Sequence, residues 1–293
     1  MASPPRPLQP RDLLLLEALS HQRVAVLAQA AHWLGVSEAT AARRVRALAR
    51  ADLVETRRIF DRGSPMLRIT GRGLAQIGSR LSRPGQKLDE YRHDVGVGWV
   101  WTAARDGAFG DLAAIHSERA LRSADARRDR LTPGERQLAV EDGHDAPGGI
   151  GVGAFLADGR PQRHYPDLLL DTASGRRIGV ELELTHKGAR RLDRIMEAYA
   201  SDLSVDAVLY LVADPRIGAQ IHAAAERADM ADRVHVRRVA RAQIGGVPGP
   251  ERGPISRGAV GRRQIGSGAR SAGVGRDRDG PASPQDQREG MTR

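Results

Sequence analysis

Apolar residues recur every three or four positions through the start of the chain, the spacing that is typical of amphipathic helices. The pattern predicts a first helix capped by Asp12, a second over Val24–Leu34 and a third over Glu38–Ala51. Gly35 supplies a tight turn between the second and third helices, and Ser37 is a favourable N-cap for the third. Two helices joined in this way are typical of a helix-turn-helix.

A basic hairpin is predicted after the third helix. Its first strand covers Thr56–Phe60 and includes Arg58, and its return strand covers Met66–Thr70. The turn between the strands carries Arg62. A helix-turn-helix followed by such a hairpin indicates a winged helix over residues 11–80.

The third predicted helix has one side made of small and basic residues, which continues into the hairpin. The candidate DNA-binding residues are Ser37, Glu38, Ala42, Arg43, Arg46, Arg58 and Arg62. Small side chains allow close approach to a groove, and arginines reach phosphates or guanine edges. Double-stranded DNA is therefore the expected partner. Two alternatives stay open: the arginines are only the solvated side of a helix, or the winged helix contacts another protein.

The later part of the chain alternates between strand and helix patterns. The pattern of residues 164–240 predicts, in order, a strand, a hairpin, a strand, a helix, a strand, a helix and a strand. The apolar run Val205–Val212 is typical of a strand covered on both faces. Residues 91–130 are expected to be mostly helical, and 132–153 to be an irregular loop. The predicted class is α+β, with the winged helix followed by an α/β/α domain over 91–240.

Composition adds a charge imbalance to this picture. Lys plus Arg number 46 and Asp plus Glu 36, a formal net charge of +10 that favours a polyanionic partner. Lys87 and Lys187 are the only lysines, and so strong an arginine bias, with abundant Ala and Gly, is also typical of a high-GC coding background. Residues 245–293 have scarcely any large apolar side chain, so a disordered basic tail is expected.

Two absences in the sequence narrow the function. The chain has no cysteine, which excludes disulfides, thiolate metal sites and cysteine nucleophiles. It also has no apolar run long enough to span a bilayer, so no membrane partner and a cytoplasmic location are expected.

The candidate chemistry is concentrated in one hairpin of the second domain. Asp167 opens one strand, and Glu181 and Glu183 lie on the next. Residues two apart on a strand point to the same side, so the two glutamates project together, and Asp167 joins them if the pairing register allows it. Converging carboxylates repel one another unless a cation neutralises them, and Mg²⁺ or Mn²⁺ prefers such oxygen ligands.

The order Pro166-Asp167, a hairpin, Glu181-x-Glu183 and then a helix resembles the PD-(D/E)XK nuclease superfamily. The resemblance implies a nuclease-like fold in which Asp167 and Glu181 bind the metal. It also implies that the last motif position, often lysine, orients the attacking water. Glu183 occupies that position here, and Lys187 is the candidate replacement cation.

A longer series of short motifs extends this resemblance over most of the predicted ordered chain. The winged helix is followed by His93-Asp94, Ser117-Glu118-Arg119, Pro166-Asp167 and an acidic pair before a helix that ends in Tyr199. This order is similar to the actinobacterial replication-relaxation family, whose members are associated with plasmids and other mobile elements. The resemblance implies that Glu118 is an additional acidic residue of the metal site.

Two functional classes follow from these patterns. The first is a DNA-binding protein that acts in plasmid replication, relaxation or mobilisation, with Mg²⁺- or Mn²⁺-dependent endonuclease (nickase) chemistry at Asp167, Glu181, Glu183 and Lys187. The second is a non-catalytic transcriptional or copy-number regulator whose second domain mediates dimerisation or partner binding; a homodimer is compatible with either class. In the second class the glutamates are acidic residues of an edge strand, where they discourage aggregation. Histidines at 93, 164 and 186 are further candidate ligands or solvated surface residues.

Overall fold

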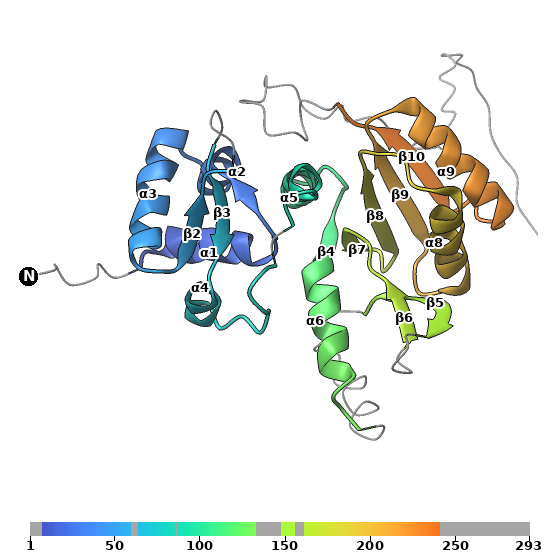
Figure 1. Ribbon diagram of the computed structural model, residues 1–293, viewed down its shortest axis with the longest axis horizontal. Coiled ribbons are helices and arrows are strands. Elements are labelled where there is room, and N and C mark those ends of the chain that lie inside the picture. The colour runs from blue at the N-terminus through green and yellow to red at the C-terminus, as the bar shows by residue number, and fades with distance from the viewer. Residues whose placement is uncertain (1–7, 60–63, 86, 133–147, 156–160, 241–293) are drawn as a thin grey trace, which may run out of the picture. The chain divides into compact units, whose positions relative to one another are not determined.

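The chain has a mixed α and β architecture, as predicted. The computed structural model describes residues 8–59, 64–85, 87–132, 148–155 and 161–240 (Figure 1). Arg62, most of the predicted irregular loop and the predicted tail 245–293 lie outside these ranges. Within them, no helix is both long and apolar enough to cross a membrane.

Four helices and a small antiparallel sheet form the N-terminal part. The elements are α1 (Pro10–Ser20), β1 (Ala25–Val26), α2 (Leu27–Leu34), α3 (Glu38–Arg50), β2 (Val54–Arg57), β3 (Met66–Ile69) and α4 (Gly71–Gln76). The strand order is β1-β3-β2. The prediction of helix from Val24 onward is wrong, because Ala25 and Val26 pair with β3 instead. The second helix therefore begins at Leu27.

Helix α3 confirms the predicted turn and cap. Gly35 has the left-handed φ of 62° that ends α2, and the Ser37 hydroxyl accepts a hydrogen bond from the Thr40 N–H. The apolar side of α3 is buried as expected, at Ala41, Val45 and Leu48. The opposite side of the helix is left to solvent.

The sequence predicted Asp12 as the N-cap of α1. The prediction is wrong, because the helix begins at Pro10, two residues before Asp12. Gln9 is the N-cap, and the Asp12 carboxylate accepts a hydrogen bond from the Gln9 N–H at 2.7 Å. Asp12 is fully buried and also takes two contacts from the Arg44 guanidinium, through Nε and one terminal nitrogen. Arg44 is therefore not a solvated residue of α3. It is the internal partner of a buried carboxylate, and it ties α3 to α1.

Gly73 in α4 gives a first test of this packing. A Cβ at Gly73 would lie 2.2 Å from the backbone oxygen of Leu53, whereas a Cβ at Gly71 would meet nothing within 4 Å. We expect Gly73→Ala to destabilise the chain by about 1–3 kcal/mol through overpacking. Gly71→Ala, in the same helix, should be neutral or slightly stabilising. Urea unfolding of both variants measures the difference, and equal stabilities would contradict the close approach of α4 to Leu53.

The C-terminal part is built on a five-stranded sheet of order β10-β9-β8-β7-β4. Its strands are β4 (Leu112–Ser117), β7 (Leu168–Thr172), β8 (Arg177–Glu183), β9 (Ala207–Val212) and β10 (Val234–Arg238). Strands β8, β9 and β10 are parallel, whereas β7 pairs antiparallel with both β8 and β4. Residues 91–130 are mostly helical, as predicted, but strand β4 lies between the two helices of this stretch and was not expected. It lies at the sheet edge and is stabilised by its pairing with β7.

Helices cover both faces of this sheet. They are α5 (Tyr91–Arg105), α6 (Glu118–Arg128), α8 (Ala189–Ser201) and α9 (Pro215–Arg227). Helices α8 and α9 pack on one face, where Met196 and Tyr199 are fully buried, and α5 packs on the other through Trp101 (Figure 1). Strand β9 is buried on both faces, as its apolar run predicted. Ala18 and Trp33 of the N-terminal part join the core around Trp101.

Two further predictions about this part of the chain are wrong. The predicted loop 132–153 ends within a strand, β5 (Ile150–Phe155), which pairs with β6 (Pro161–His164) in a separate two-stranded sheet. The glutamates of β8 do not lie on an edge strand, because β8 is hydrogen-bonded to β7 on one side and to β9 on the other. Glu181 and Glu183 are buried, with exposures of 3% and 5%. They need internal partners rather than solvent.

Candidate functional site

The solvent side of α3 carries a row of exposed cations. Arg43, Arg46 and Arg50 are exposed, and Arg43 donates a hydrogen bond to the Thr40 hydroxyl. Among the described residues, none of the three arginines has a carboxylate partner. Ala42 lies on the same side and is half-buried. This surface therefore presents unneutralised guanidinium groups around a small side chain, as the sequence predicted.

The N-terminus of α3 and the adjoining hairpin extend this surface. Ser37 and Glu38 are exposed at the start of the helix, and Arg58 is exposed just after β2. Arg62 lies in the part of the hairpin that is not described. The predicted DNA-binding residues that the structure describes thus all lie at accessible or half-buried positions.

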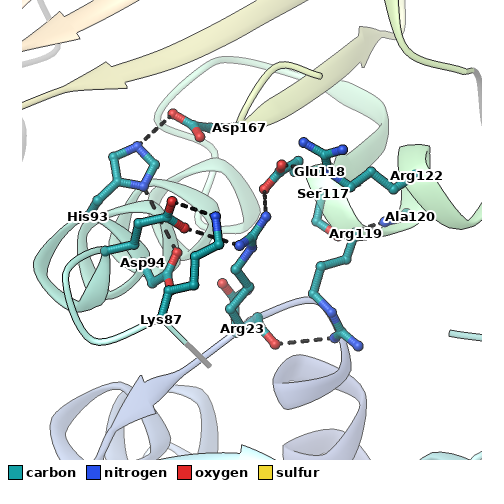
Figure 2. A network of polar contacts seen from close by, with 12 residues as sticks. Arg23, Lys87, His93, Asp94, Ser117, Glu118, Arg119, Ala120, Arg122 and Asp167 are labelled. Atoms are coloured by element: carbon teal, nitrogen blue, oxygen red, sulfur yellow. Dashed lines mark hydrogen bonds and ion pairs between the residues drawn. The ribbon is translucent and has the colours of Figure 1, made fainter. Parts of the chain in front are cut away.

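Asp167 lies just before β7 and is held by two donors. Its Oδ2 accepts a hydrogen bond from the Leu182 N–H at 2.8 Å, and His93 Nε2 lies 3.2 Å from the same oxygen. His93 Nδ1 lies 4.0 Å from Oδ1 of Asp94, so the imidazole stands between two carboxylates (Figure 2). Burial alone would lower the pKa of His93, but Asp167 and Asp94 outweigh it and raise the pKa to about 11. His93 is therefore a cation at neutral pH and neutralises Asp167.

Glu118 begins α6 and is tied to the same place. Its N–H donates to the backbone carbonyl of Asp167 at 3.1 Å, and its carboxylate pairs with Arg23 and Arg122, each at 2.7 Å (Figure 2). A cavity of about 20 Å³ is lined by Glu118, Asp167, His93 and Arg23, among others. It has room for about one water-sized group. The structure thus brings Glu118 and Asp167 to one small cavity, together with the cationic side chains of His93, Arg23 and Arg119.

Glu181 points to the α8 side of the sheet and is enclosed by hydrogen-bond donors. The Tyr199 hydroxyl donates to its Oε1 at 2.7 Å, and His164 Nε2 lies 2.6 Å from the same oxygen. Burial alone would raise the pKa of Glu181, but His164, Lys187 and Tyr199 outweigh it and lower the pKa. Glu181 is therefore a buried carboxylate that stays ionised because its surroundings are cationic and donate hydrogen bonds.

Glu183 is paired with Lys187, which lies two residues before α8. The Lys187 Nζ is 2.5 Å from Glu183 Oε2, and both side chains are largely buried. Burial alone would lower the pKa of Lys187, but Glu181, Glu183 and Asp167 outweigh it and raise the pKa. The ammonium of Lys187 thus interacts with the three carboxylates that the sequence grouped together. It supplies one of the positive charges that they require.

The predicted metal ligands already have partners within the chain. Among the described residues, no group of three or more histidine, aspartate or glutamate side chains is arranged to hold a metal ion. Asp167 is paired with His93, Glu118 with two arginines, and Glu181 with His164 and Tyr199. In this arrangement the donor set does not fit Mg²⁺ or Mn²⁺. A divalent cation would have to displace side chains that neutralise the cluster now.

The structure also assigns partners to residues whose role the sequence left open. Arg23 pairs with Glu118 and Glu90, and no local pattern indicates this, because the contact joins distant segments. Of the candidate histidines, His93 contacts Asp167 and His164 contacts Glu181. His186 contacts Gln220 instead. Tyr199, the last residue of the motif series noted in the sequence, is fully buried and donates a hydrogen bond to Glu181.

A scan against models of known protein families found no match to this chain, and a search of curated proteins found none either. The arrangement of its own side chains is therefore what indicates its function. Two arrangements stand out: the exposed arginines of α3 and the buried carboxylates around Lys187.

Proposed function

We propose that the chain binds double-stranded DNA through an N-terminal winged helix-turn-helix made of α1, α2, α3 and the sheet β1-β3-β2. The observation that carries the proposal is the side of α3 that holds Arg43, Arg46 and Arg50, exposed and without carboxylate partners among the described residues. Helix α3 would be the recognition helix, with its N-terminus at the base edges and its arginines at phosphates or guanines. The net charge of +10 adds nonspecific attraction to the duplex.

Removing Arg43 and Arg46 together tests this proposal. In Arg43→Ala/Arg46→Ala we expect duplex binding to weaken by at least about tenfold, because each base contact contributes about 1–3 kcal/mol and each phosphate contact releases counterions. The matched control is Arg176→Ala/Arg216→Ala, which removes the same charge from exposed arginines of the C-terminal part. Fluorescence anisotropy with a labelled duplex measures both variants. Equal affinities would mean that α3 is not the DNA-binding element.

We further propose that this binding serves a plasmid or another mobile element, in replication, relaxation or mobilisation. The support is the order of motifs shared with the replication-relaxation family. Such a role requires preference for particular DNA, so a duplex from the origin or transfer region of the element that encodes the chain should bind more tightly than a random duplex of equal length. Identical affinities for both duplexes would remove the support for an element-specific role.

For the C-terminal domain, we propose a nuclease-like fold that does not cleave DNA in the arrangement seen here. Lys187, His93 and His164 supply internal positive charge or hydrogen bonds to the acidic residues of the predicted metal site. This supports the class of non-catalytic regulators, in which the domain contributes dimerisation or partner contacts.

Metal-dependent cleavage is the second candidate, and one observation favours it. Leu168, which follows Asp167, pairs with Val180, which precedes Glu181, and Asp167 also lines a small cavity with Glu118. Incubation of supercoiled plasmid with the protein and Mg²⁺ or Mn²⁺ separates the candidates. The non-catalytic proposal predicts unchanged topology with both metals. Nicking that disappears in both Asp167→Ala and Glu181→Ala would establish the enzyme instead.

A further inference from the structure

A second cavity, of about 490 Å³, lies between the segment after α4 and helix α6. Seven of the residues that line it are arginines, and among the described residues none of its lining is acidic. Arg80 and Arg83 come from the segment after α4, and Arg23 comes from the segment between α1 and β1. The volume is in the range of cavities that hold small molecules. Its walls, however, are far more basic than those of an ordinary ligand pocket.

The other wall of this arginine-lined cavity is one side of α6 and the turn that follows it. Arg119, Arg122 and Arg127 stand at helical spacing, with the small residue Ala126 between the last two, and Arg130 follows the helix. At 1.5 Å per residue, Arg119 and Arg127 are separated by about 12 Å along the helix axis. One DNA strand advances about 3.4 Å along the duplex axis per phosphate, so a wall of this length can contact more than one phosphate.

The charge of the arginine-lined cavity is only partly balanced within the chain. Arg23 pairs with Glu118 and Glu90, Arg122 pairs with Glu118, and Arg83 pairs with Glu55. Among the described residues, Arg80 and Arg130 are exposed and have no carboxylate partner. The lining therefore includes at least two guanidinium groups that no described carboxylate neutralises.

Arg119 is the most enclosed of these cations. Its guanidinium donates to the backbone carbonyls of Ser20, Gln22 and Ser82, which are neutral acceptors. Burial, together with Arg23, lowers the pKa of Arg119 to about 10, so the group is still charged at neutral pH. These hydrogen bonds connect α6 to the segment after α1 and to the segment after α4. This structural role explains why an arginine is present at position 119. It does not account for the further arginines gathered around the same cavity.

We propose that the arginine-lined cavity binds phosphate groups, carried either by the DNA backbone or by a small polyphosphate ligand. The planar guanidinium fork matches phosphate oxygens in a bidentate way, and a cavity wall that is partly shielded from water strengthens each charge-assisted hydrogen bond. Arg23 and Arg119 line this cavity and also the small cavity that holds Asp167 and Glu118. Phosphate bound by the arginines would therefore lie next to Asp167 and Glu118. The site requires neither DNA binding by α3 nor cleavage.

The test uses the full chain and two double charge reversals of equal size. Arg80→Glu/Arg130→Glu alters both walls of the cavity at exposed positions, whereas Arg176→Glu/Arg216→Glu alters exposed arginines outside its lining. Binding of sodium tripolyphosphate is measured by calorimetry, and binding of a labelled duplex by anisotropy at several salt concentrations. Thermal melting checks that both variants fold. If the cavity variant does not, Arg80→Gln/Arg130→Gln takes its place against Arg176→Gln/Arg216→Gln.

Two results would support the site and distinguish its source of phosphate. Tripolyphosphate binding that is at least about tenfold weaker in the cavity variant than in the control indicates a small polyphosphate ligand. Duplex binding that weakens by at least about tenfold more than in the control, with a salt slope reduced by about 2, indicates the DNA backbone. Variants that behave alike with both probes would overturn the proposal. If the native chain binds no duplex but the tripolyphosphate result holds, only the proposed DNA-binding function fails.

Discussion

Replacing Asp12 with alanine should destabilise the native chain by about 3–5 kcal/mol, the range observed when one member of a buried ion pair is removed. Asp12 has no exposed surface, and the Arg44 side chain that it pairs with is only 16% exposed. Asp12→Ala removes the buried carboxylate that this guanidinium contacts, and also removes the acceptor for the Gln9 N–H at the start of α1. The loss affects the contact between α1 and α3, which positions the proposed recognition helix.

Urea unfolding measures this effect, with Asp232→Ala as the control because Asp232 is exposed. The control should change the free energy of unfolding by no more than about 0.5 kcal/mol. The double variant Asp12→Ala/Arg44→Met should recover part of the loss, since it also removes the largely buried cation and fills its volume with an apolar side chain. If Asp12→Ala were as stable as the control, the buried pair would not hold α3 to α1.

The second large effect is expected at Lys187. Lys187→Met keeps the length of the side chain but removes the cation that faces Glu181, Glu183 and Asp167. Two of these carboxylates are at least 95% buried, so we expect a loss of about 3–5 kcal/mol at neutral pH. A divalent cation can then replace the missing charge, and addition of Mn²⁺ should restore part of the stability of the variant.

Lys87 provides the matched control, because it is the only other lysine and its ion pair with Glu90 is largely exposed. Lys87→Met should cost at most about 1 kcal/mol and should show no response to Mn²⁺. Thermal unfolding of both variants with and without Mn²⁺ makes the comparison. Equal stability of the two variants would show that Lys187 does not neutralise the cluster. A response to Mn²⁺ in the native chain would show that a metal competes with Lys187 without any mutation.

The sequence predicted most reliably the elements whose pattern is local and strong. Helix α3 has a glycine turn, a serine cap and a clear apolar side, and the structure has it within one residue of its predicted end. Strand β9 was predicted from a continuous apolar run, because a strand covered on both faces has no polar side. The projection of Glu181 and Glu183 to one side followed from the two-residue repeat of a strand.

The elements and contacts that the sequence did not predict depend on segments far apart in the chain. Strand β1 is two residues long and exists through its pairing with β3, while β4 gains its partners from β7. No local pattern joins Arg23 to Glu118. The helical spacing of arginines in α6 was visible in the sequence. The cavity that these arginines line could not be predicted, because its other wall is the segment after α4.

The most direct test of the central claim, duplex binding through α3, is the salt dependence of the native chain's affinity for DNA. Arg43, Arg46, Arg50 and Arg58 are available for phosphates, so we expect log K to fall linearly with log salt concentration, with a slope of about −3 to −4. In Arg43→Ala/Arg46→Ala the slope should be smaller in magnitude by about 1 to 2. Failure of the native chain to bind duplex at low salt, or an unchanged slope in this variant, would contradict the claim.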